Sequence, residues 1–179
     1  MNFNSKRTPI TYKIKLPPYE IFPIISGNKI SLREIMKADI EDLIEISFYD
    51  AIQTTTFQQA EEMQAKTNKD YIDGKSIHWG IADNATNKIV WTCGYYRGLD
   101  KGAGEHGCAL LPQYCGQGFM TLAMVLAIDF GVNTIGLKRI WAITTKQNVK
   151  TIKLLENLNF IKIADLDDNE MEYELKQNA

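Results

Sequence analysis

The feature that most constrains the fold is a junction at residues 105–130, where an apolar run ends at Pro112 and a long apolar segment starts at Phe119. Proline lacks the N–H that a central strand donates, so Pro112 marks the end of a strand. Gly116 and Gly118 let the backbone approach a ligand closely, and the first N–H groups of the following helix have no partner within the helix. Because the helix dipole also favours negative charge there, the junction predicts a site for a diphosphate.

The strand before the junction offers a second binding element. Where it separates from its neighbour, the backbone of Leu110 and Leu111 is free to hydrogen-bond an extended chain that contains amides, as a peptide does at a sheet edge. Pantetheine is such a chain. A strand-to-helix turn that binds no ligand is the alternative interpretation of Gly116 and Gly118.

Two other nucleotide-binding motifs are excluded by their context. Residues 102–107 read G-x-G-x-x-G, but a short apolar run follows them where the dinucleotide fingerprint requires a helix. We therefore interpret residues 98–104 as the glycine-rich loop of a hairpin. No G-K-[ST] follows the later glycine pair, which excludes a P-loop.

Composition and charge narrow the class of protein. The chain has 179 residues, 45% of them hydrophobic and 23% charged, which is enough for one domain with a substantial core. A net charge of −2 argues against a nucleic-acid partner, because a protein that binds nucleic acid requires a basic face. The most apolar stretch, residues 119–130, is too short to span a bilayer, and no apolar run follows the basic N-terminus as in a signal peptide. We expect no membrane segment and a monomer or homodimer.

The cysteines predict a cytoplasmic protein with no bound metal. Cys93, Cys108 and Cys115 form no C-x-x-C pair and have no histidine at metal-ligand spacing. Cys93 and Cys108 lie in apolar strand candidates, where free cysteine is usually a small buried hydrophobe. Cys115 lies beside the predicted helix start, where a thiolate is stabilised, so it is either an easily alkylated residue or a packing residue.

Hydrophobic periodicity predicts a single α/β domain over residues 29–179, preceded by an extended arm over residues 1–28 that contains four of the five prolines. Asp39 is the expected N-cap of the first helix, and the strands before the junction form an antiparallel meander. The elements expected before the junction are strands at 29–35, 76–82, 88–96 and 105–111 and helices at 40–47 and 58–72.

After the junction, a largely apolar helix at 117–133 leads to a strand at 138–145, and this order forms a parallel crossover. Asn148 is expected to cap a second amphipathic helix, which Asn159 ends in a left-handed conformation. Two final strands are expected at 160–164 and 171–175. The predicted fold is therefore α/β (α+β), with a mixed twisted sheet of six to seven strands and helices on both faces.

The junction and the region after it resemble the GNAT superfamily of N-acetyltransferases. Residues 113–118, Q-Y-C-G-Q-G, match the family's acetyl-CoA motif Q/R-x-x-G-x-G/A. Two further patterns are similar to the branch that includes the ribosomal-protein alanine N-acetyltransferases. They are Glu105-x-Gly107 with Leu111-Pro112 before the motif, and N-x-x-[ST]-x-x-L-x-E-x-x-x-F over 148–160 after it. The likeness covers about residues 29–175, and implies a single acetyl-CoA-binding N-acetyltransferase domain.

The resemblance implies acetyl-CoA as co-substrate, and an amine that attacks the acetyl thioester. The residues expected to bind acetyl-CoA are Leu110, Leu111, Gln113, Cys115, Gly116, Gln117, Gly118, Phe119, Met120 and Asn148. Helix capping alone also explains Asn148.

Three residues are candidates for catalysis. Glu105 is the candidate base, acting through a water, although a surface carboxylate at a strand end is the alternative. Thr151 stands where the branch has a hydroxyl that can protonate the leaving thiolate. Leu155 replaces the tyrosine that many family members use, so Tyr173 or solvent is a further candidate acid. Neither His78 nor His106 is expected to contact substrate, because His106 should face away from Glu105 and His78 lies in an apolar run.

Two classes of function follow from these residues. The first is an enzyme that acetylates a primary amine, with a protein N-terminus as the first substrate and a polyamine or amino-sugar as the alternative. The second is a CoA-binding sensor without catalysis, which the missing tyrosine supports.

Overall fold

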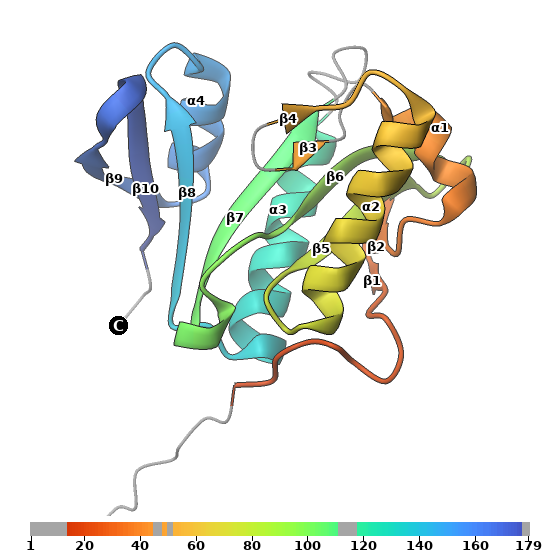
Figure 1. The fold of residues 1–179 in the computed structure, drawn as a ribbon. Helices are drawn as coiled ribbons and strands as arrows, with labels where there is room; N and C mark the ends of the chain where they lie inside the picture. Colours follow the sequence, from red (N-terminus) through yellow and green to blue (C-terminus); the bar gives the residue numbers. More distant parts are fainter. Residues whose placement is uncertain (1–13, 45–47, 50–51, 111–117, 177–179) are drawn as a thin grey trace, which may run out of the picture.

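The structure is a computed structural model that describes residues 14–44, 48–49, 52–110 and 118–176 (Figure 1). Its centre is one mixed sheet of eight strands in the order β1-β2-β5-β6-β7-β8-β10-β9. The strands are β1 (Ile25–Ser26), β2 (Ile30–Arg33), β5 (Ile77–Asp83), β6 (Ile89–Tyr95), β7 (Ala103–Leu110), β8 (Arg139–Thr145), β9 (Phe160–Asp165) and β10 (Glu170–Leu175). A separate two-stranded sheet pairs β3 (Phe48–Tyr49) with β4 (Ile52–Gln53).

Helices cover both faces of the sheet, with α2 on one side and α3 on the other (Figure 1). The α-helices are α1 (Ile40–Leu43), α2 (Phe57–Ile72), α3 (Phe119–Phe130) and α4 (Val149–Asn157). Short 3-10 turns lie at Lys37–Asp39, Leu99–Lys101 and Asp167–Asn169, and a π-helical turn, Gly131–Ile135, extends α3. The predicted α/β class, with its antiparallel meander and helices on both faces, is confirmed.

The sheet has eight strands where six to seven were predicted. The eighth strand is β1, whose Ile25 pairs with Leu32 of β2. Prolines dominate the sequence around β1, so no alternation indicated a strand there. The chain before β1 also contacts the domain: the Lys15 N–H donates to the Ile135 carbonyl at 2.9 Å, and the Trp79 indole donates to the Pro23 carbonyl at 3.0 Å.

The core lies between the sheet and α3. Ile77, Trp79 and Ile81 of β5 point to this side together with their β6 partners, and all are fully buried. The Trp79 ring meets Phe130 of α3 edge to face, with ring centroids 5.3 Å apart. The hydroxyl of Tyr95, a buried β6 residue, donates to the Ala127 carbonyl of α3 at 2.7 Å. We call this side the α3 face and the opposite side the α2 face.

Strands β7 and β8 form the parallel pair of the predicted crossover, and they soon separate. Their pairing covers only Ala103–Glu105 of β7 and Arg139–Trp141 of β8. Beyond Glu105, β7 follows β6, whose Trp91 pairs with Leu110, while β8 follows β10. The two strands diverge from there to their ends (Figure 1). Strand β7 does separate from a neighbour, as expected, but it does so after Glu105 and not at Pro112, and it stays paired with β6 through Leu110. We call the Glu105–Trp141 pair the branch point.

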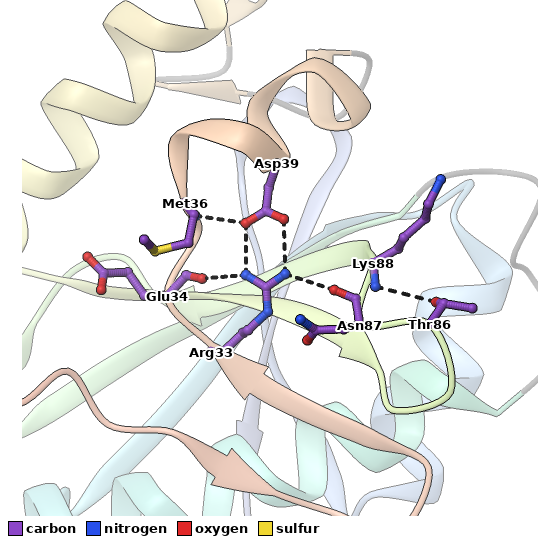
Figure 2. Close-up of polar contacts among 7 residues, drawn as sticks. All are labelled: Arg33, Glu34, Met36, Asp39, Thr86, Asn87 and Lys88. Atoms are coloured by element: carbon purple, nitrogen blue, oxygen red, sulfur yellow. Dashed lines mark hydrogen bonds and ion pairs between the residues drawn. The ribbon is translucent and has the colours of Figure 1, made fainter.

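A polar clamp fastens β2 to the start of α1 and to the β5–β6 turn (Figure 2). The Arg33 guanidinium donates to both Asp39 carboxylate oxygens, at 2.8 and 2.9 Å, and to the Asn87 carbonyl at 2.9 Å. Asp39 directly precedes α1, as predicted, but its side chain does not cap that helix. It instead accepts the Met36 N–H at 2.8 Å, because the chain enters α1 through a 3-10 turn.

Candidate active site

Glu105 lies at the branch point on the α2 face. Its neighbour His106 pairs with Tyr95, whose side chain contacts α3, so the alternation of side chains along a strand turns Glu105 the other way. The Glu105 side chain is 15% exposed, and its carboxylate accepts two hydrogen bonds from Arg97, at 2.7 Å from Nε and 3.1 Å from the terminal nitrogen. The candidate base is therefore an ion-paired group at the point where the sheet divides.

Helix α3 begins as the junction predicted. Its N-cap is Gly118, with φ of 76°, and no acidic side chain lies in the first turn. A glycine offers no side chain to bond the first helical N–H groups, and among the described residues a Cβ built on Gly118 would meet no atom within 4 Å. Left-handed backbone, a Cβ position clear of the other described residues, and N–H donors that have no partner within the helix together fit an anion such as the diphosphate of coenzyme A.

The first residues of α3 lie beside the free end of β7. Phe119 packs edge to face on Trp91, with ring centroids 5.4 Å apart, and Trp91 is the register partner of Leu110. The half-buried side chains of Phe119 and Met120 pack against the core. Five of the residues expected to bind acetyl-CoA lie outside the described part of the chain: Leu111, Gln113, Cys115, Gly116 and Gln117.

Asn148 and Thr151 lie at the start of α4, directly after β8. The Asn148 side-chain oxygen accepts the Thr151 N–H at 3.2 Å, which confirms the predicted cap. The Thr151 side chain is half-buried. The two residues thus follow the strand that forms the far side of the branch from Glu105.

Tyr173 lies away from Glu105. Through the register of the sheet, Glu105 pairs with Trp141 and Trp141 with Glu174, so these three side chains share the α2 face. Tyr173 precedes Glu174 and therefore points to the opposite face, where it is 3% exposed within the core. The structure does not bring Tyr173 and Glu105 together.

The histidines and strand cysteines are packing residues. Burial lowers the pKa of His106 to about 4 and is the main cause of a similar value for His78, so both rings are neutral at pH 7. Cys93 is fully buried, as expected, and Cys108, its cross-strand partner, packs against the core. A hydrogen bond between the Cys108 and Cys93 thiols, together with burial, raises the pKa of the Cys108 thiol well above its usual range. Cys115 lies outside the described residues.

Sequence reasoning missed Arg97, which follows β6 and contacts Glu105. Nothing in the order Tyr96-Arg97-Gly98 indicated more than a turn, because the contact depends on the pairing of β6 with β7. Among the described residues, no cluster of three or more His, Cys, Asp or Glu side chains is arranged to hold a metal ion. Within the same residues, no helix combines the length and apolar composition needed to cross a membrane.

Comparison with known proteins identifies the family. Residues 29–161 match the model of the acetyltransferase (GNAT) domain. The chain belongs to the GNAT family. It is 32% identical to the N-acetyltransferase p20 of Bacillus licheniformis over 117 residues, which are 65% of this chain and 66% of p20. It is 25% identical to the N-acetyltransferase YoaA of Bacillus subtilis (strain 168) over 150 residues, 79% of this chain and 85% of YoaA.

Solved structures share the fold at low sequence identity. A ribosomal-protein-serine acetyltransferase from Vibrio cholerae superposes with a TM-score of 0.73 at 16% identity, covering 85% of this chain and 96% of that one. A spermidine N-acetyltransferase from the same organism gives 0.70 at 16% identity, covering 82% and 93%. As a member of this family the protein is an N-acetyltransferase, and the family's co-substrate is acetyl-CoA.

Proposed function

We propose that this protein transfers the acetyl group of acetyl-CoA directly to a primary amine while both are bound. The observation that supports this most is the arrangement around the branch point. The helix start that fits a diphosphate lies beside β7, and the Glu105 carboxylate lies at the branch on the α2 face. A thioester held between the separated strands is thus open to an amine from the Glu105 side.

In this proposal, three segments of the chain bind acetyl-CoA: the start of α3, the end of β7 and the start of α4. The N–H groups of Phe119 and Met120 bond the diphosphate, and Gly118 permits its close approach. The backbone of Leu110, at the end of β7 beyond its pairing with β8, bonds the amides of the pantetheine arm together with the backbone of Leu111, which lies outside the described residues. Asn148 contacts the arm from α4. The remaining contacts come from Gln113, Cys115, Gly116 and Gln117.

Each chemical step requires one group from the protein. Glu105 accepts the proton of the attacking amine, through a water, as the nitrogen bonds the acetyl carbon. A backbone N–H near Leu110 or Leu111 stabilises the tetrahedral oxyanion. As the carbon–sulfur bond breaks, a hydroxyl protonates the departing thiolate. Thr151 is favoured over Tyr173, because Thr151 is half-buried at the start of α4 while Tyr173 is enclosed on the other face.

The first acceptor we propose is the amino group of a protein N-terminus. An α-amino group has a pKa near 8, whereas a lysine amine has one near 10.4, so far more of the former is neutral at pH 7. A polyamine or amino-sugar is the alternative acceptor. Both acceptors would use the same Glu105, Thr151 and α3 start, so these residues do not distinguish a protein N-terminus from a polyamine or amino-sugar. A panel of substrates is needed to distinguish them. A cytoplasmic location remains a prediction from the cysteines.

Two measurements test the proposal. Calorimetry should detect binding of coenzyme A, and a panel of N-terminal peptides, polyamines and amino-sugars should release free thiol from acetyl-CoA in an amine-dependent way. Glu105→Gln should lower kcat by at least about 100-fold while CoA still binds. Tight CoA binding without turnover on any amine would indicate the sensor function instead, and absence of binding would refute both.

A further inference from the structure

We propose that Arg97 is a positioning residue for Glu105, an inference that rests on the proposed role of Glu105 as base. The two groups form a two-point contact, since Nε of Arg97 donates to one carboxylate oxygen at 2.7 Å and the terminal nitrogen donates to the other at 3.1 Å. A planar guanidinium bonded in this way fixes both the position and the plane of a carboxylate. A single lysine contact would leave the carboxylate free to rotate.

A β-bulge aims Arg97 at Glu105. Beyond the last regular pair, Tyr95 with His106, the Tyr96 N–H donates to the Glu105 carbonyl at 2.9 Å and the Glu105 N–H donates to the Arg97 carbonyl at 3.0 Å. Two residues of one strand thus face one residue of the other, which redirects the side chain that follows. Arg97 is therefore joined to Glu105 through both backbone and side chain.

The next residue holds this loop against the branch point. Gly98 has φ of 88°, and a Cβ there would lie 2.5 Å from the ring of Trp141. Trp141 is the register partner of Glu105 across the parallel pair. The loop that contains Arg97 and Gly98 is thus packed on β8, the strand that separates from β7. A large shift of Arg97 would require this loop to move away from Trp141.

The contact leaves Glu105 able to act. An ionised carboxylate has about four lone-pair positions, and the two bonds from Arg97 use two of them. The remaining positions can accept a water or the attacking amine. The Arg97 side chain is 71% exposed, so its bond to Glu105 adds little to folding stability and its main effect is on where the carboxylate sits.

The test compares Arg97→Gln and Arg97→Lys with Glu105→Gln, using the amine that is acetylated fastest. Arg97→Gln should lower kcat about 10- to 100-fold, because a small misplacement of a catalytic group costs this much, while KM for acetyl-CoA stays within about twofold. Arg97→Lys should recover part of the loss, since it restores one bond and the charge. The melting temperature should fall by no more than about 3 °C in either variant.

Lys101→Gln is the matched control. It removes one cation from the same loop, at an exposed position that forms no ion pair with the described residues, and kcat should not change. If Glu105→Gln is inactive but Arg97→Gln retains wild-type kcat, the positioning role is refuted while the proposed function stands. If Glu105→Gln keeps its activity, Glu105 is not the base and both proposals on this residue fall. An equal loss in Lys101→Gln would show a general charge effect and overturn the inference.

Discussion

Replacing Gly118 by alanine should separate the binding of coenzyme A from folding stability. Gly118 has φ of 76°, and a non-glycine residue in this left-handed region costs about 1–2 kcal/mol. The alanine also restricts the unfolded chain, which offsets about 0.4–1 kcal/mol. The net loss of about 1 kcal/mol corresponds to a fall of about 2–4 °C in melting temperature for a protein of this size.

The effect on binding should be larger. A Cβ on Gly118 contacts no atom of the other described residues within 4 Å, so we expect the added methyl group to project into the space that we assign to the diphosphate. Losing one charge-assisted hydrogen bond costs about 1.5–3 kcal/mol. This corresponds to a Kd for coenzyme A that is about 10- to 100-fold higher. Titration calorimetry measures the Kd, and a thermal melt measures the stability.

Gly136→Ala is the matched control. Gly136 also has a left-handed φ, of 87°, and a Cβ there would come no closer than 4.0 Å to Ile14. It follows the π-helical turn at the far end of α3 from Gly118. We expect a similar fall in melting temperature with a Kd within about twofold of wild type. Equal Kd values for the two variants would refute the assignment of the diphosphate to the α3 start.

Two further predictions concern stability. Asp39→Ala should destabilise the protein by about 2–3 kcal/mol, measured by urea unfolding at pH 7, because it breaks the bonds to Arg33 and Met36. Burial alone would raise the pKa of Asp39, but its hydrogen bonds to Arg33 and Met36 lower the pKa overall. The stability that Asp39 contributes is therefore present at neutral pH and is lost as pH falls through its folded pKa. On acidification the variant should lose less stability than wild type. His106→Leu removes a buried ring whose Nε2 has no partner among the described residues, and should raise the melting temperature by about 2–4 °C. The folded pKa of His106 is about 4 against an ordinary 6.5, so the free energy of unfolding of wild type falls by up to about 3 kcal/mol between pH 6.5 and pH 4. For the variant, the free energy of unfolding should change less with pH over this range. If the free energy of unfolding of either variant depended on pH as steeply as that of wild type, the titration assigned to that residue would be contradicted.

Local chemistry accounts for the parts of the fold that could be predicted. The hairpin of β5 and β6 follows from two β-branched and aromatic runs around a turn, and α3 follows from its apolar stripes after Gly118. Asn148 caps α4 and Asn159 ends it with φ of 64°, each because of what one side chain can do beside its own backbone. Such rules act within a few residues, so a sequence contains all the information they need.

The candidate site could be predicted only in part for the same reason. Gly118 and the cap at Asn148 are local features, and both were found. Arg97 was missed and Tyr173 was grouped with Glu105, because contact and facing depend on which strands pair and in what register. A shift of one residue in register would turn every side chain of a strand to the other face. No nearby residue reports that choice.

By itself, the sequence determined the alternation of helices and strands, the crossover after β7 and the glycine that starts α3, since these depend on backbone preferences and on apolar spacing. Only the tertiary structure decided that β7 and β8 part after Glu105, that β1 completes the sheet and that Arg97 meets the Glu105 carboxylate. These features arise from hydrogen bonds between segments far apart in the chain. The energy of such pairings depends on how all strands pack together, which no single segment encodes.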